Sequence, residues 1–338
     1  MKKLLDAIQE NSPKKVNLLI DAGADVNIHS AGNEYPLHMA IEKGHYQVAE
    51  LLIKRGANVN AEGKYHRTPL FIAAEKGHAI IVKLLINNNN VDVNLQNGEL
   101  YPPLHIAARR GHKETVQLLI DAGAGVNIQH NSDDYAPLHL ATLKGHYEVA
   151  ELLIKRGAYV NAEGGHHRTP LHIAMEKGHD KLMKLLINKG AEANIKTDNG
   201  DTCLYIAAKN QNVELVKLLI NKGADVNEKI NNGMTPLHMA VVTGNEKVIQ
   251  LLTMAHANVN SQDVKERTPL DIAVQLKKSA EIINLLTKAP ADHVDEETYS
   301  ESSQASVSDL MDGEVNPQEG LDDVSVSGQV AGAEDLEA

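Results

Sequence analysis

A leucine followed three residues later by an alanine recurs along this chain at a nearly constant interval of 33 or 34 residues. The nine leucines are Leu4, Leu37, Leu70, Leu104, Leu138, Leu171, Leu204, Leu237 and Leu270. A fixed interval of this length indicates a row of similar small units, each of which contacts only its neighbours. This repeat limits the possible folds more than any other feature of the sequence, because such a row has no single large core.

The unit around Leu70 shows what each repeat encodes. Thr68 can cap the free amides of a helix, Pro69 suits its first turn, and Gly77 predicts its end. A second helix is predicted over residues 79–86, where apolar residues recur at spacings of three and four and so share one face. Helices this short are not stable alone in water, so each must pack against neighbouring units. We therefore predict an all-α repeat solenoid.

The repeated motifs resemble a known family. The sequence Thr-Pro-Leu at residues 68–70, 169–171, 235–237 and 268–270 resembles the ankyrin-repeat signature, and residues 152–161 and 219–227 resemble the end of that repeat's second helix. The resemblance covers residues 1–289. It implies nine helix–turn–helix units joined by β-hairpin fingers, with the fingers and first helices lining a concave groove. It also implies a non-enzymatic protein–protein interaction scaffold, since the family carries no catalytic residues.

Three fingers depart from the family pattern. His66, His167 and Glu266 stand where the repeat usually has glycine, as it does at Gly200 and Gly233. Because non-glycine residues rarely adopt the left-handed conformation of such a turn, we expect strain or rearrangement in these three fingers.

The end of the chain differs in composition from the repeats. From Pro290 onward there are 14 acidic residues and no Lys or Arg, whereas the rest of the chain carries 31 acidic and 33 basic residues. The net charge of −12 therefore comes from the last segment. Few apolar residues and a high charge of one sign predict disorder. We predict two parts, a solenoid over residues 1–289 and a disordered acidic tail over residues 290–338.

Candidate chemistry is sparse. Ten of the 17 histidines occupy recurring positions in the repeat, which the family uses for hydrogen bonds between units. His166 and His167 are adjacent in an extended finger, so they point to opposite faces and suit a metal ion poorly. Cys203 replaces a repeat proline, which predicts a buried, inert thiol. We predict no enzyme activity, metal site or cofactor.

The charge distribution also bears on the partner. Nucleic-acid binding needs a basic stripe, and the repeats are only weakly positive in total, so we expect no nucleic-acid ligand. No apolar run is long enough to cross a membrane. We therefore predict a cytoplasmic protein that binds a partner protein and is itself a monomer, although nothing in the sequence fixes its oligomeric state.

Aligning the units on their leucines places the finger tips and the ends of the first helices in the middle of the chain. Tyr and Arg gather there, and these residues often anchor interfaces. The predicted binding residues are Lys64, Tyr65, Arg67, Tyr101, Arg109, Arg110, Tyr135, His166 and Arg168. Glu99 and Asp133 are also assigned to finger tips. The alternative is that finger tips are polar only because water surrounds them.

An internal duplication gives modest support to the binding interpretation. Residues 44–78 and 145–179 align without gaps and differ at six of 35 positions. Two of the differences, Lys64/Gly165 and Tyr65/His166, fall at predicted finger tips.

Two further interpretations concern the biology of the chain. Near-identical units rich in Lys, Asn and Ile resemble ankyrin proteins of intracellular bacteria, which implies an effector secreted into a host cell to act on host proteins. The acidic tail would then be a secretion signal. Alternatively, the tail is an autoinhibitory pseudo-ligand that masks Arg109, Arg110 and Lys144.

Overall fold

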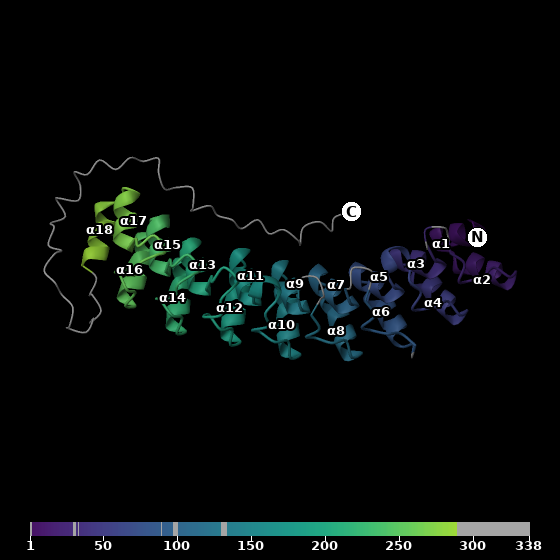
Figure 1. Cartoon of the computed structure of the whole chain (residues 1–338). Helices are drawn as coiled ribbons and strands as arrows, with labels where there is room; N and C mark the ends of the chain where they lie inside the picture. The colour runs from purple at the N-terminus through teal and green to yellow at the C-terminus, as the bar shows by residue number, and fades with distance from the viewer. Residues whose placement is uncertain are drawn as a thin grey trace. The chain divides into compact units, whose positions relative to one another are not determined.

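The computed structural model describes residues 2–29, 32, 34–88, 90–96, 101–129 and 134–288. Within them the chain forms eighteen α-helices of seven to nine residues and two short 3-10 helices, with no residue in a strand (Figure 1). The chain divides into two compact units, Met1–Glu192 and Ala193–Ala338. The sequence repeat continues unchanged across this division. The predicted boundary between residues 289 and 290, and the whole predicted tail, lie outside the described residues and stay predictions.

The first unit contains twelve α-helices among its described residues. They are α1 (Lys2–Gln9), α2 (Pro13–Asp21), α3 (Pro36–Glu42), α4 (Tyr46–Lys54), α5 (Pro69–Lys76), α6 (Ala79–Ile86), α7 (Pro103–Arg110), α8 (Lys113–Asp121), α9 (Pro137–Leu143), α10 (Tyr147–Lys155), α11 (Pro170–Glu176) and α12 (Asp180–Asn188). The 3-10 helices η1 (Lys64–His66) and η2 (Gly165–His167) precede α5 and α11.

The second unit contains six α-helices in its described part. They are α13 (Cys203–Lys209), α14 (Val213–Asn221), α15 (Pro236–Thr243), α16 (Glu246–Met254), α17 (Pro269–Gln275) and α18 (Ala280–Thr287).

Each unit is built of two helix layers (Figure 1). Every odd-numbered helix packs against the even-numbered helix that follows it. In the first unit the odd-numbered helices α1 to α11 contact one another in order, and α2 to α12 do the same in a second layer. In the second unit α13, α15 and α17 form one layer, and α14, α16 and α18 form the other. The predicted repeat solenoid is confirmed within each unit.

Helix α5 shows why the sequence folds this way. The Thr68 hydroxyl accepts a hydrogen bond from the Phe71 amide at 3.1 Å, Pro69 occupies the first turn, and Gly77 ends the helix with φ 69°. All six residues from Pro69 to Ala74 are buried. A helix with apolar residues on nearly every side must be covered by neighbouring helices. Helix α5 accordingly lies against α3, α6 and α7.

The fingers are short turns rather than assigned hairpins. The Gly63 amide donates to the Arg67 carbonyl at 2.9 Å, and the equivalent bond closes the turn from Gly164 to Arg168 at 2.9 Å. Because no described residue lies in a strand, the predicted β-hairpins are not confirmed.

The strain predicted where other residues replace the finger glycine is confirmed. His66, His167 and Glu266 have φ values of 54°, 53° and 60°, in the left-handed region. The finger turn thus keeps its backbone conformation even though its usual glycine is replaced.

An asparagine after each second helix ties neighbouring repeats together. Asn127 donates from Nδ2 to the Gly157 carbonyl at 2.9 Å and accepts from the Tyr159 amide at 2.8 Å. Asn227 makes the same pair of contacts with His256 and Asn258, at 3.4 and 2.7 Å. These amides are therefore used to fix the loop of the following repeat.

Candidate functional site

The finger that precedes α5 presents an exposed aromatic ring. Tyr65 is 57% exposed and lies at φ 58°. The Lys64 ammonium lies 4.7 Å from the centroid of its ring, a cation–π contact. The Nδ1 atom of His66 lies 2.7 Å from the Glu62 carboxylate and holds the other side of the turn. The tip is thus a platform that presents a ring and a cation to solvent.

The second copy of this finger has the same backbone and a different tip. His166 takes the place of Tyr65, at φ 60°, and is also exposed. The His167 Nδ1 atom lies 2.6 Å from the Glu163 carboxylate, as His66 does from Glu62 in the first copy. The duplication therefore preserved the parts that fix the turn and changed the residue it presents.

Arg67 braces the finger rather than forming its tip. Its guanidinium lies 5.5 Å from the centroid of the Tyr65 ring and 5.7 Å from that of Phe71. It also donates to the Glu75 carboxylate at the end of α5, at 3.3 Å. The side chain is 27% exposed, so it joins the finger to the helix and offers little surface to a partner.

Arg168 also contacts an aromatic ring and the acid at the end of its helix, but its ring partner belongs to the preceding finger. Its guanidinium lies over the Tyr135 ring at 5.8 Å and donates to Glu176 at the end of α11, at 3.3 Å. Only 17% of the side chain is exposed.

Tyr101 and Tyr135 are buried, which contradicts the prediction that they are exposed interface anchors. Tyr101 is 8% exposed and Tyr135 is 2% exposed. The Tyr135 ring stacks on His139 at 5.2 Å between centroids, with 5° between the planes. Both tyrosines stand on the returning arm of the finger, where the side chain turns toward α7 or α9. The exposed tip comes two residues earlier in the repeat, as Tyr65 shows.

Glu75 is a functional candidate outside the set of predicted binding residues. Its carboxylate accepts from Arg67 and also from Arg110 of the next repeat, at 3.1 Å, and its side chain is 12% exposed. Lys76 lies 2.6 Å from Glu42 of the preceding repeat. Comparing the fifth and sixth residues after each repeat leucine would have shown these charges in register.

A histidine at the start of the second helix makes the same hydrogen bond to the preceding repeat in successive repeats. The Nε2 atoms of His112 and His146 donate to the carbonyls of Glu75 and Arg109, each at 2.9 Å. These hydrogen bonds between repeats confirm the role that the resemblance implied for these histidines. Arg109 is half-buried, whereas Arg110 is exposed. Glu99 and Asp133 lie outside the described residues.

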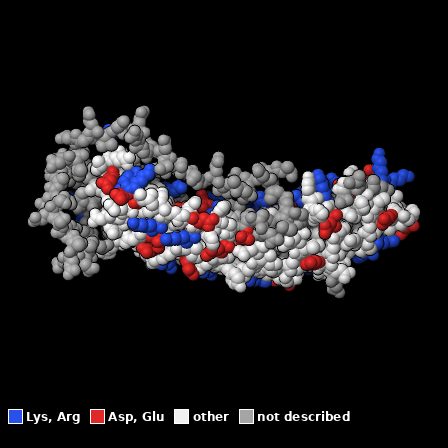
Figure 2. Space-filling model, viewed as in Figure 1, with Lys and Arg blue, Asp and Glu red and all other residues white. Residues whose placement is uncertain are grey.

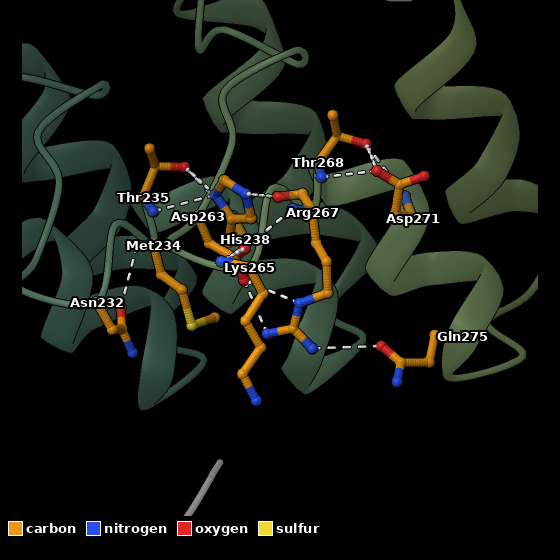
Figure 3. Close-up of polar contacts among 10 residues, drawn as sticks. All are labelled: Asn232, Met234, Thr235, His238, Asp263, Lys265, Arg267, Thr268, Asp271 and Gln275. Atoms are coloured by element: carbon orange, nitrogen blue, oxygen red, sulfur yellow. Dashed lines mark hydrogen bonds and ion pairs between the residues drawn. The ribbon is translucent and has the colours of Figure 1, made fainter. Parts of the chain in front are cut away.

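The second unit has a finger of different chemistry (Figure 3). Asp263 accepts from the Arg267 guanidinium at 2.7 and 2.9 Å, and its side chain is 2% exposed. Burial alone would raise the pKa of Asp263, but the hydrogen bonds from Arg267 and from the Lys265 amide outweigh it and lower that pKa. The Nε2 atom of His238 donates to the Arg267 carbonyl at 3.1 Å. This finger is a closed polar network.

Two family models match this chain. A model of ankyrin repeats in three copies matches residues 4–97, 82–164 and 162–230, and a model of many ankyrin repeats matches residues 211–253. The chain belongs to the ankyrin-repeat family. Ankyrin repeats generally mediate protein–protein interactions and are typically not enzymes. No curated protein matches the chain. The matches end at residue 253, so the count of nine repeats stays a prediction.

The remaining chemistry of this ankyrin-repeat chain is limited in the described residues. No three His, Cys, Asp or Glu side chains among them are grouped to hold a metal ion. Cys203 is fully buried, as predicted, and burial raises the pKa of its thiol. None of the helices in the described part is long and apolar enough to cross a membrane. Over α13 to α17, the face in view in Figure 2 mixes positive and negative side chains.

Proposed function

We propose that this ankyrin-repeat protein is a non-enzymatic scaffold that binds a partner protein through the finger side of its first unit. The main supporting observation is the Tyr65 platform. The left-handed turn costs free energy at Tyr65, and more than half of the side chain is exposed to solvent. Contact with a partner protein would offset this cost. The same turn presents His166 one hundred and one residues later on a nearly identical scaffold.

The contact residues in this proposal are the exposed members of the predicted set. They are Lys64, Tyr65, Arg110 and His166. Arg67 and Arg168 act through the fingers they brace. Tyr101 and Tyr135 support the surface from below, since their rings are buried.

The test starts from a partner recovered by cross-linking in a lysate and identified by mass spectrometry. Its affinity is then measured for the full chain and for a variant with Lys64→Ala, Tyr65→Ala and His166→Ala together. A loss of about tenfold or more is expected, because exposed aromatic anchors dominate interface energies.

Tyr159→Ala provides the matched control. Tyr159 is 68% exposed in the same unit but lies in the loop after α10, outside the finger turn from Gly164 to Arg168. Its replacement should leave affinity unchanged. If the triple variant binds as well as the unaltered chain, the finger side is not the binding surface.

A further inference from the structure

Five successive first helices of the first unit either end in a basic residue or are followed directly by one. This basic ladder consists of Lys43, Lys76, Arg110, Lys144 and Lys177, each six residues after the repeat leucine and each exposed. Their helices α3, α5, α7, α9 and α11 contact one another in that order, so the ladder is a continuous row.

The second and third rungs of the ladder, Lys76 and Arg110, are neutralised by the preceding repeat. Lys76 pairs with Glu42 at 2.6 Å, and Arg110 pairs with Glu75 at 3.1 Å. In each pair the acid is the fifth residue after its own repeat leucine. The two contacts therefore have the same geometry one repeat apart.

The next rungs lack that acid. Arg109 and Leu143 occupy the positions that Glu42 and Glu75 hold in the earlier repeats. The backbone arrangement is the same, because His146 and His179 contact the carbonyls of Arg109 and Leu143 at 2.9 and 3.5 Å, as His112 contacts that of Glu75.

This substitution leaves the later cations without the partner that the repeat would supply. In the repeat register, Arg109 takes the place of the acid for Lys144, and Leu143 takes it for Lys177. Among the residues that the structure describes, Lys144 and Lys177 form no ion pair.

Helix stability alone does not account for the ladder. A cation at the end of a helix does interact favourably with the helix dipole. However, the ladder position is not basic at the ends of α15 and α17, where Thr243 and Leu276 occupy it. The row suits a negatively charged ligand better than it suits the fold.

We propose that an extended acidic segment of a partner protein lies along Lys144 and Lys177. This inference rests on the proposed function and specifies the partner's chemistry. Packed helices lie about 8–10 Å apart, and an extended chain advances about 3.3 Å per residue. An acidic side chain at every third residue of the segment therefore meets successive rungs.

The first experiment uses two synthetic peptides and the full chain. One peptide carries Glu at every third position among Ser and Gly residues, and the other has the same composition with its Glu residues contiguous. Binding is measured by fluorescence anisotropy at low and moderate salt. The spaced peptide should bind about fivefold more tightly, and its affinity should fall as salt screens the charges. Equal affinities would overturn the proposed register.

The second experiment neutralises the ladder. The variant Lys144→Gln with Lys177→Gln should bind the spaced peptide about tenfold more weakly. The matched control is Lys83→Gln with Lys184→Gln, because these exposed lysines lie on α6 and α12, outside the ladder. The control loses the same charge and should keep its affinity. Equal losses in the two variants would show only a general attraction to net charge and would overturn the proposal.

Two further measurements distinguish the other possible occupants. A single-stranded oligonucleotide that binds more tightly than the spaced peptide, with the same dependence on Lys144 and Lys177, would replace the acidic segment by a nucleic acid. If removal of residues 290–338 raises peptide affinity several-fold, the chain's own acidic end occupies the ladder instead. Either result contradicts the proposal, which expects weaker oligonucleotide binding and no effect of the truncation.

The inference and the proposed function can fail separately. If the natural partner depends on Lys64, Tyr65 and His166 but not on Lys144 and Lys177, the ladder inference is wrong and the proposed function stands. If the natural partner ignores all of these residues, the proposed function is wrong as well.

Discussion

The Glu75 carboxylate lies 3.1 Å from the guanidinium of Arg110, a residue 35 positions further along the chain. Arg67 donates to the same carboxylate from within its own repeat, at 3.3 Å. One half-buried acid thus links a finger, the end of its helix and the end of the next helix. The order of the finger side depends on this contact between repeats.

Replacing Glu75 should therefore affect stability more than replacing an ordinary surface acid. Glu75→Gln keeps the shape and removes the charge that both arginines share, so the free energy of unfolding should fall by about 1 kcal/mol. Glu50→Gln, which breaks the exposed pair with Lys54, should cost less than about 0.5 kcal/mol. Urea titrations of the two variants provide the comparison, and equal losses would contradict a linking role for Glu75.

Tyr135 and Tyr65 should respond in opposite ways to truncation. Tyr135→Ala leaves a cavity under the finger and should lower the free energy of unfolding by about 3 kcal/mol or more. Tyr65→Ala removes an exposed ring, so its effect should stay within about 0.5 kcal/mol while partner affinity falls. Chemical denaturation and partner titration measure the two effects. A large stability loss in Tyr65→Ala would mean that this ring is structural.

Asp263→Asn should destabilise the second unit. The amide can still accept from the backbone, but its NH2 group would face the Arg267 donors that Oδ2 now accepts. We expect a loss of about 2–3 kcal/mol in the free energy of unfolding. The control is Asp225→Asn, since the carboxylate of that exposed residue accepts from the Asn227 amide at 2.8 Å and the Asn oxygen can do the same. Hydrogen exchange of α15 and α17 would localise the effect, and unchanged exchange would count against it.

His66→Gly should stabilise the first unit. An L-residue in the left-handed region costs about 1–2 kcal/mol, and glycine adopts this conformation freely. Loss of the exposed pair with Glu62 and the greater flexibility of the unfolded glycine offset part of this gain, leaving about 0.5–1 kcal/mol. His78→Gly is the control because His78 has φ −77°, so glycine there should be destabilising. A lower melting temperature for His66→Gly would show that the turn is not strained.

Stability should fall in mild acid. Burial is the main cause that lowers the pKa values of His38 and His238 below their usual value. The unfolded chain, with a His pKa of about 6.5, then binds more protons than the folded one. The contribution of these neutral histidines is complete above that pKa and is lost as the pH falls below it. Urea midpoints measured from neutral pH downward should decrease, and His238→Gln should flatten the decrease.

The sequence allowed the repeat and its helices to be predicted because that information is local. Thr68, Pro69 and Gly77 mark the start and end of one helix by the conformations that these residues prefer. The leucine interval predicted stacked pairs because short amphipathic helices can bury their apolar faces only against neighbours. The left-handed turns at His66 and His167 followed from the glycine that they replace.

The tertiary structure alone decided which of those residues are exposed. Tyr65 and Tyr135 are both finger tyrosines in the sequence, yet one ring is exposed and the other stacks on His139. The exposure of the two rings differs because Tyr135 stands two positions later in its finger than Tyr65 does. That shift takes the residue from the tip to the arm that returns to the helix. Glu75 likewise pairs with Arg110 although the two residues are 35 positions apart. Lys144 has no such acid in the preceding repeat. Only the stacking of one repeat on the next brings those charges together.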